Sequence, residues 1–452
     1  MLDAETKSHS PLTLVKSPAE GISGEYRFWR GRVMVWSIVG YAAFYFVRKN
    51  LAIAMPVMES QLGLHKSDLG MFLTLHGLLY GVSKFGNGIV GDRVSAPWFM
   101  ALGLAACALL NVGFGLSSTV IVLGLLWMAN GWFQGIGFPP CARLMTHWYR
   151  PGELATKMSI WNTSHSIGTA GVMILCGYLV GHFGNWRLCF FVPAGIALVV
   201  AVLLVIRLPD TPRSVGLEEL RETETSGGAK PAGDVLWEKV FSNPYIWLIA
   251  GANFFVYTIR YGMLDWGPTM LKETRGIQIA NGGWMMAAFE GAGLAGMLTA
   301  GWLTDRIFGG RGARMCLICM VCCGVSMLLF WWVGTRSLWM SIVTLMLSGF
   351  FIYGPQALVG IAVANLGTKR AAATAVGLTG IFGYASTVLS GWGLGKMVES
   401  YGWDRAFAGL VGMCVLGVTM FALAWGARAD GYERQSQMKA GFPVLPVGRP
   451  AE

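Results

Sequence analysis

The sequence is poor in charge. Asp, Glu, Lys and Arg make up only 13% of its 452 residues, against about 25% in an ordinary soluble domain. Apolar residues make up 54%, and the mean hydropathy is +0.53. So few polar side chains cannot cover the outside of a globule of this length, which excludes a soluble fold. Long uncharged stretches recur instead, each near the ~20 residues that cross a bilayer as a helix.

Acidic residues are especially scarce, which argues against an enzyme. Asp and Glu total 24, and Asp265 and Glu290 are the clearest examples inside apolar stretches. A membrane phosphotransferase would need a nucleophile with a base, or acids clustered around a metal. Four cysteines gather within residues 316–323, but no histidine accompanies them there. They predict helix packing, and we expect no metal and no cofactor.

The apolar stretches predict an all-α membrane protein of twelve transmembrane helices in two six-helix halves. The approximate limits are 33–56, 69–91, 96–116, 119–145, 158–181, 186–206, 244–271, 281–303, 313–333, 337–365, 371–397 and 403–427. We expect a disordered cytoplasmic tail at 1–26, halves at 27–206 and 244–428, a cytoplasmic linker at 207–243 and a cytoplasmic tail at 429–452.

Basic residues predict the orientation in the membrane. They are concentrated before the first span, in the linker 207–243, and after the fourth, eighth and tenth spans. Because loops rich in Lys and Arg stay in the cytoplasm, both termini are expected there. The net charge of +10 then reflects topology, and no nucleic-acid partner is expected. Bundles of this class need no second copy, so we expect a monomer in the bilayer.

The two halves repeat one another. "GNGIVGDR" ends the second span and "GWLTDR" ends the eighth, which places Asp92-Arg93 and Asp305-Arg306 213 residues apart. Chains built from two such halves bind substrate near the membrane midplane, between the halves. The Gly-x-x-x-Asp-Arg motif resembles the signature loop of the major facilitator superfamily. That resemblance implies structural and gating roles for these four residues, through charge pairs at helix ends.

Two cations interrupt the first span. In "YAAFYFVRKN", Arg48 and Lys49 lie past its middle, where a charge costs at least ~2.5–3.5 kcal/mol. Snorkelling to the helix end is one explanation. The other is the repeat, because Arg260 lies 212 residues after Arg48, at the matching place in the seventh span. Two arginines facing one cavity would grip the oxygens of a tetrahedral anion. Phosphate is the first candidate, and sulfate or a dicarboxylate are alternatives.

Polar rings and bases either share a helix face with one of these arginines or lie inside the second and fifth spans. They are Tyr41 and Tyr45 on the first span, His76, Tyr80 and Lys84 on the second, His165 on the fifth, and Tyr257 with Tyr261 on the seventh. Each ring alone fits ordinary core packing. Together with two arginines, they are expected to donate hydrogen bonds to phosphate or to a substrate hydroxyl. Lys84 contacts the substrate or pairs with Glu290, and the sequence leaves both open.

Motifs along the chain carry a more specific resemblance. "GYAAFYFVRKN", "YGVSKFGNG", "GWFQGIGFPPCAR", "WNTSHSIG", "VYTIRYGMLDWGPTMLKE", "IYGPQALVG" and "GLTGIFGY" occur in order between about Arg27 and Arg428. They are similar to the organophosphate:phosphate antiporter family of the major facilitator superfamily. The resemblance implies substrate binding by Arg48, Arg260, Lys84, His165, Tyr41, Tyr45, Tyr80, Tyr257 and Tyr353, and by Lys49 adjacent to Arg48. Ser166 departs from that pattern, since the family usually has Asn there.

The resemblance also implies an activity. The family exchanges an organic phosphate ester for inorganic phosphate by alternating access across the bacterial cytoplasmic membrane. "RYGMLDWGPTMLKE" resembles the glycerol-3-phosphate and phosphoglycerate branches, so these esters are favoured. "EYRFWR" and "WNT" resemble a sensor branch that does not transport but signals to a membrane kinase. A hexose-6-phosphate transporter is the other alternative. Asp265 and Glu290 are expected to take part in gating or structure.

Overall fold

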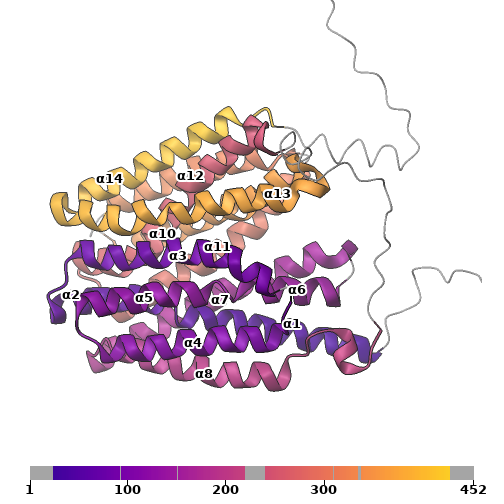
Figure 1. The fold of residues 1–452 in the computed structure, drawn as a ribbon. Coiled ribbons are helices and arrows are strands. Elements are labelled where there is room, and N and C mark those ends of the chain that lie inside the picture. The colour runs from indigo at the N-terminus through magenta and orange to yellow at the C-terminus, as the bar shows by residue number, and fades with distance from the viewer. Residues whose placement is uncertain are drawn as a thin grey trace, which may run out of the picture.

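The computed structural model describes residues 24–91, 93–149, 151–218, 240–308, 310–333 and 337–427. Within these ranges the chain is helical and has no β-strand. Figure 1 shows the helices of the first half, in indigo to magenta, lying below those of the second half, in orange to yellow. The predicted all-α membrane fold is confirmed.

The helices lie over the predicted spans, although several of their boundaries differ. In the first half they are α1 (Gly24–Phe46), α2 (Asn50–Leu62), α3 (Lys66–Gly91), α4 (Ala96–Leu116), α5 (Val120–Gln134), α6 (Phe138–Trp148), α7 (Pro151–Phe183) and α8 (Leu188–Arg207), followed by the short helix η1 (Pro212–Val215). In the second half they are α10 (Pro244–Arg275), α11 (Ile279–Phe308), α12 (Gly312–Val333), α13 (Leu338–Ala385), the π-helical turn η3 (Val388–Gly393) and α14 (Leu394–Leu423).

Helix lengths differ from the predicted spans at several places. The first span is split between α1 and α2, and the fourth between α5 and α6. Conversely, α13 runs through the predicted tenth and eleventh spans, and α14 joins the eleventh to the twelfth across a kink at Gly402, where φ is +80°. Seven helices in the described part of the chain are long and apolar enough to cross a membrane. The half boundaries 27–206 and 244–428 stay predictions. Residues 24–26, predicted to belong to the disordered tail, are helical and begin α1. The rest of the predicted tails and most of the linker lie outside the described residues.

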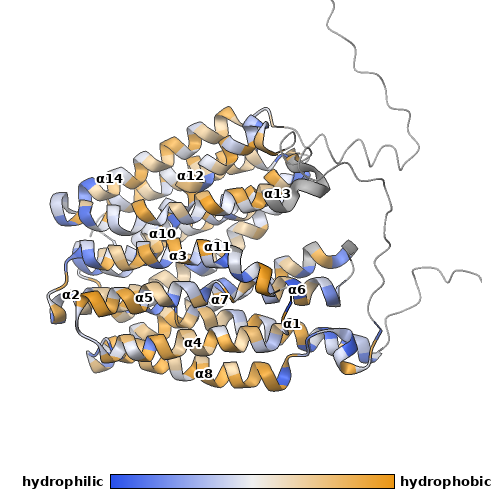
Figure 2. Cartoon of the chain, viewed as in Figure 1, coloured by the Kyte–Doolittle hydropathy of each residue, from blue (hydrophilic) through white to orange (hydrophobic). Residues whose placement is uncertain are grey.

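Apolar side chains lie both inside the bundle and on its outer surface. One buried cluster belongs to the first half and includes Trp148 and Trp161, and the larger one extends across both halves. Figure 2 shows orange, apolar residues along the outward faces of the helices. Large side chains such as Trp98, Ile121 and Trp339 are exposed there. Because lipid tails are as apolar as a protein core, this surface fits a bilayer.

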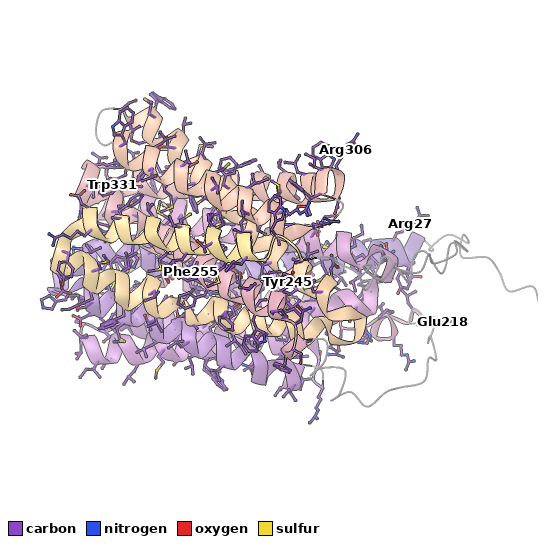
Figure 3. All side chains as sticks on the ribbon, turned by 90° about the horizontal axis from the view of Figure 1, so that it is seen from above. Arg27, Glu218, Tyr245, Phe255, Arg306 and Trp331 are labelled. Carbon is purple, nitrogen blue, oxygen red and sulfur yellow. The ribbon has the colours of Figure 1, made fainter. Side chains whose placement is uncertain are left out.

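Three of the connections predicted to share one side of the membrane lie at one end of the bundle. In Figure 3, Arg27 before the first span, Glu218 in the central connection and Arg306 after the eighth span all lie at the same end, while Trp331 lies at the other. We refer to the two ends as the terminal end and the α2–α3 end. The assignment of the terminal end to the cytoplasm stays a prediction.

Candidate functional site

Arg48 and Lys49 lie in a break between two helices. The break spans residues 47–49, and the backbone carbonyl oxygens near it are bonded by side chains of distant helices. The Val47 oxygen accepts from Asn111 Nδ2 and Asn130 Nδ2, both at 3.0 Å, and the Phe44 oxygen accepts from Gln134 Nε2 at 2.9 Å. Irregular backbone at membrane depth is stable only when its polar groups are satisfied in this way. The break therefore fixes the two cations inside the bundle.

Arg48 is surrounded by aromatic rings. Its side chain is buried, and its Cζ lies 4.2 Å from the ring centre of Tyr80 and 5.5 Å from that of Tyr45. Within the described residues it forms no ion pair with a carboxylate. Rings attract a desolvated cation by roughly 2 kcal/mol, which is less than a carboxylate would provide. Arg48 is thus a buried cation whose charge is only partly compensated.

Arg260, in α10, lies in a hydrogen-bonded group of the second half. Its Nη2 donates to the Tyr353 hydroxyl at 2.8 Å, and that hydroxyl donates to Glu290 Oε1. Arg260 Nη2 is also 3.7 Å from the same carboxylate oxygen. Arg260 Nε and Glu290 Oε2 are both buried and have no hydrogen-bond partner. The group therefore keeps one donor and one acceptor free for a ligand.

Lys49 connects the two halves. Its Nζ forms a buried hydrogen bond and ion pair with Asp265 Oδ1, from α10, and lies 4.8 Å from the ring centre of Tyr261. We predicted Lys49 as a substrate-binding residue and Asp265 as a gating or structural one. In this conformation the ammonium group is already paired, so the arrangement supports a role for Lys49 in holding the halves together.

His165 lies between the two arginine environments. Its ring centre is 6.0 Å from that of Tyr45, next to Arg48, and 6.2 Å from that of Tyr353, which bonds Arg260. Its Nδ1 is 2.9 Å from Ser166 Oγ, while its Nε2 is buried without a hydrogen-bond partner. The predicted convergence of His165 with both arginines is therefore present in the structure.

Lys84 is not paired with Glu290, although the sequence left that pairing open. Its Nζ lies 4.2 Å from the ring centre of Phe138 and 5.8 Å from that of Tyr384, whereas Glu290 belongs to the Arg260 group. Lys84 lines a cavity of about 500 Å³ together with residues of α3 and α6, which are Gly88, Phe138, Pro139, Ala142, Arg143, Thr146 and His147. It therefore borders open space while carrying a positive charge.

The tyrosines form one network, and sequence reasoning missed part of it. The ring centres of Tyr41 and Tyr45 are 5.5 Å apart and those of Tyr257 and Tyr261 are 5.3 Å apart, and both pairs pack edge to face. Tyr384, which no prediction included, joins the halves by lying 4.8 Å from Tyr80 and 6.2 Å from Tyr257. Its motif "GLTGIFGY" was visible, but nothing in the spacing indicated which face of a 48-residue helix points inward.

The signature loops lie away from this network. Arg93, Asp305 and Arg306 are exposed, and Arg306 Cζ lies 5.6 Å from the Trp302 ring centre. Asp92 lies outside the described residues. Their gating role stays a prediction.

The donor set suits an anion. Among the described residues no group of three or more His, Cys, Asp or Glu side chains is placed to hold a metal. Arginine, histidine and tyrosine instead present N–H and O–H donors in a buried space, as a phosphate group requires.

Comparison with known proteins shows which family and which transporters the chain is similar to. A family model described as the Major Facilitator Superfamily matches residues 37–391. The chain is 36% identical to a "Probable hexose phosphate transport protein" of Chlamydia trachomatis, covering 95% of this chain and 99% of that one. It is 37% identical to the "Glycerol-3-phosphate transporter" of Bacillus subtilis, covering 90% and 95%. It is 35% identical to the "Membrane sensor protein UhpC" of Escherichia coli, covering 88% and 94%.

A solved structure has the same fold. The inward-facing, unoccupied structure of a bacterial homologue of the human lysosomal transporter Spinster aligns with a TM-score of 0.73 at 15% identity, covering 91% of this chain and 99% of that one.

Proposed function

Because this chain belongs to the Major Facilitator Superfamily and to its organophosphate:phosphate antiporter family, we propose that it exchanges an organic phosphate ester for inorganic phosphate by alternating access. The phosphoryl group would be held between Arg48 of the first half and Arg260 of the second. We further propose that it acts as a monomer in the bacterial inner membrane with both termini in the cytoplasm.

The observation that carries this proposal is the unequal compensation of two buried arginines. Arg260 has Glu290 and Tyr353 beside it, while among the described residues Arg48 is compensated by aromatic rings and by no carboxylate. A phosphate dianion between the halves would give Arg48 the negative partner that it lacks, and it would meet the free Nε of Arg260 and the free Nε2 of His165. Charge-assisted hydrogen bonds of this kind are worth about 1.5–3 kcal/mol each.

The same imbalance supports obligatory exchange. Leaving a buried charge without its partner costs several kcal/mol. An empty carrier would meet that cost at Arg48 as the cavity closes around it, whereas a loaded carrier would not. The loaded forms should therefore interconvert quickly and the empty form slowly.

Two ester classes compete. Glycerol-3-phosphate and phosphoglycerate are the first candidates, from the motif around Arg260. Hexose 6-phosphate is the second, because the Chlamydia relative named for hexose phosphate matches nearly its whole length. The 35% identity to a sensor keeps a third possibility, in which the protein binds the ester and signals to a membrane kinase.

The test is uptake of labelled glycerol-3-phosphate by purified protein in liposomes, loaded with phosphate or left empty. We expect uptake only into phosphate-loaded vesicles. Arg48→Lys and Arg260→Lys should each lower it by roughly ten- to a hundredfold, because lysine cannot make the forked contact. Arg207→Lys, at an exposed helix end, is the matched control and should behave like the wild type.

Each outcome has a distinct meaning. Competition by unlabelled phosphoglycerate and hexose 6-phosphate would name the ester. Thermal protection by these esters without any uptake would support the sensor. Equal uptake into empty and loaded vesicles would contradict exchange, and full activity in both arginine variants would contradict the site.

A further inference from the structure

Ser166 and His165 are neighbours in α7 whose side chains bond to each other. Ser166 Oγ lies 2.9 Å from His165 Nδ1, and both residues are buried, at 3% and 5% exposure. At a pH above the ordinary histidine pKa of about 6.5, a histidine ring carries a single hydrogen, on Nδ1 or on Nε2. The bond with Ser166 decides which nitrogen carries it.

The hydrogens of this pair can be accounted for. A buried hydroxyl is stabilised when it donates its hydrogen, since an unsatisfied buried donor costs roughly 1–3 kcal/mol. Glu290 is the competing acceptor, because its carboxylate also lies near Ser166. Yet neither carboxylate oxygen of Glu290 is hydrogen-bonded to Ser166, because the bond to Oε1 comes from Tyr353 and Oε2 has no hydrogen-bond partner. The acceptor at bonding distance is therefore the Nδ1 lone pair of His165.

The other ring nitrogen follows from this assignment. If Nδ1 accepts, the ring hydrogen lies on Nε2, which is buried without a partner between the environments of Arg48 and Arg260. A bare lone pair there would repel an anion, whereas an N–H donates to it. We propose that Ser166 is a positioning residue that holds His165 in the Nε2–H form, so that His165 enters the site as a donor to a phosphate oxygen.

This inference rests on the proposed function for its ligand, but the ring hydrogen itself can be observed without any ligand. Residue 166 then acts on anion affinity although it does not touch the anion. The proposal concerns the form of the imidazole, and it predicts that the hydroxyl at position 166 matters through its hydrogen and not through its volume.

The experiment uses the full-length protein labelled with ¹⁵N-histidine, at about pH 8, where an ordinary histidine is neutral. The protonated and bare ring nitrogens have separate ¹⁵N resonances, and His165→Gln identifies the signal of His165. We expect Nε2 to be protonated in the wild type. Ser166→Ala should shift the signal toward the Nδ1–H form and weaken inorganic phosphate binding by about two- to tenfold, as the competent form becomes less populated.

Ser164→Ala is the matched control. Ser164 lies in the same helix, is fully buried and has a hydroxyl without a hydrogen-bond partner, but it is not bonded to His165. It should leave both the ¹⁵N spectrum and phosphate affinity unchanged. Ser166→Thr keeps the hydroxyl and should retain the wild-type spectrum.

Two results would overturn the inference. One is an Nδ1–H signal in the wild type, which would mean that Ser166 donates to Glu290. The other is a Ser166→Ala spectrum identical to the wild type. If wild-type protein instead binds no phosphate while the spectra behave as expected, the positioning role stands and the proposed function fails.

Discussion

At the scale of single residues, three buried cations are compensated in three ways. Lys49 has a carboxylate from the opposite half, Arg260 has a carboxylate and a hydroxyl from its own half, and Arg48 has aromatic rings. Desolvated charges are stable only in proportion to such partners. The residue with the weakest compensation is the one that a bound anion would stabilise most.

Glu290 should determine how strongly a bound anion increases the thermal stability of the protein. We expect Glu290→Gln to lower the thermal stability of the empty protein by about 1–3 kcal/mol, because Arg260 loses a charged neighbour 3.7 Å away. Phosphate should then stabilise the variant more than the wild type, since the anion no longer competes with a carboxylate. Thermal unfolding in detergent, with and without saturating phosphate, measures both effects.

Glu25→Gln, at an exposed position near the start of α1, is the control and should resemble the wild type. A phosphate-induced shift in Glu290→Gln no larger than that of the wild type would show that Glu290 does not compete with the anion.

Sequence reasoning placed the cations but not their partners. The nearly equal offsets of Arg48–Arg260 and of the Asp-Arg motifs predicted two matching arginines. Which acid would pair with which base depends on how α10 and α11 rotate against the first half, and no local pattern encodes that rotation. As a result, we considered Glu290 as an ion-pair partner of Lys84, but Glu290 lies beside Arg260. We assigned Lys49 to substrate binding, but in this structure Lys49 forms an ion pair with Asp265.

At the scale of elements, the helices contain breaks that the hydropathy of the sequence does not predict. Residues 33–56 read as one apolar span, yet α1 ends at Phe46 and α2 begins at Asn50. The break is possible because Asn111, Asn130 and Gln134 bond its carbonyl oxygens from α4 and α5. These partners are 64 to 90 residues away in sequence, so only the assembled fold brings them together.

Helix packing in the second half depends on a glycine contact between α11 and α13. A Cβ on Gly296 would lie 1.8 Å from the backbone oxygen of Phe350, which no side-chain movement relieves. We expect Gly296→Ala to lower the free energy of unfolding by about 1–3 kcal/mol or more. Gly291→Ala in the same helix meets nothing within 4 Å and should be neutral or slightly stabilising, since alanine favours helix.

Melting temperatures of the two purified variants in detergent compare them directly. Equal melting of both would mean that α11 and α13 can separate at Gly296 without cost.

At the scale of the whole molecule, the two halves are held together at the α2–α3 end. Lys66 pairs with Glu59 of its own half and, at 3.0 Å, with Glu273 of the other. Lys272 donates to the Pro56 oxygen at 3.0 Å, and the Ser67 backbone donates to Glu399 at 3.1 Å. The cavity beside Lys84 lies along α3 and α6. It is near Gly91, where α3 ends, and therefore away from the α2–α3 end of the bundle. A carrier must break one such set of contacts to expose its site on that side.

The pKa of Lys66 supports a contact that lasts through neutral pH. Burial favours the neutral amine, but hydrogen bonds with Glu59 and Glu273 outweigh it and raise the pKa of Lys66 above the ordinary lysine value. A raised lysine pKa stabilises the folded contact fully below about pH 10.4, and that stabilisation is lost as pH rises through the folded pKa. Changes of pH around neutrality should therefore leave the Lys66 contacts between the two halves intact.

Removing the Lys66 charge should loosen the α2–α3 end. We expect Lys66→Gln to increase hydrogen–deuterium exchange in residues 59–68 and 270–276, because the pair between the halves is lost while the fold remains. Lys396→Gln is the matched control, since that lysine is 52% exposed and its ion pair with Glu399 lies within its own helix. Exchange that rises equally in both variants, or in neither, would show that Lys66 does not hold the halves together. A rise confined to Lys66→Gln would identify this contact as part of the barrier that alternating access must cross.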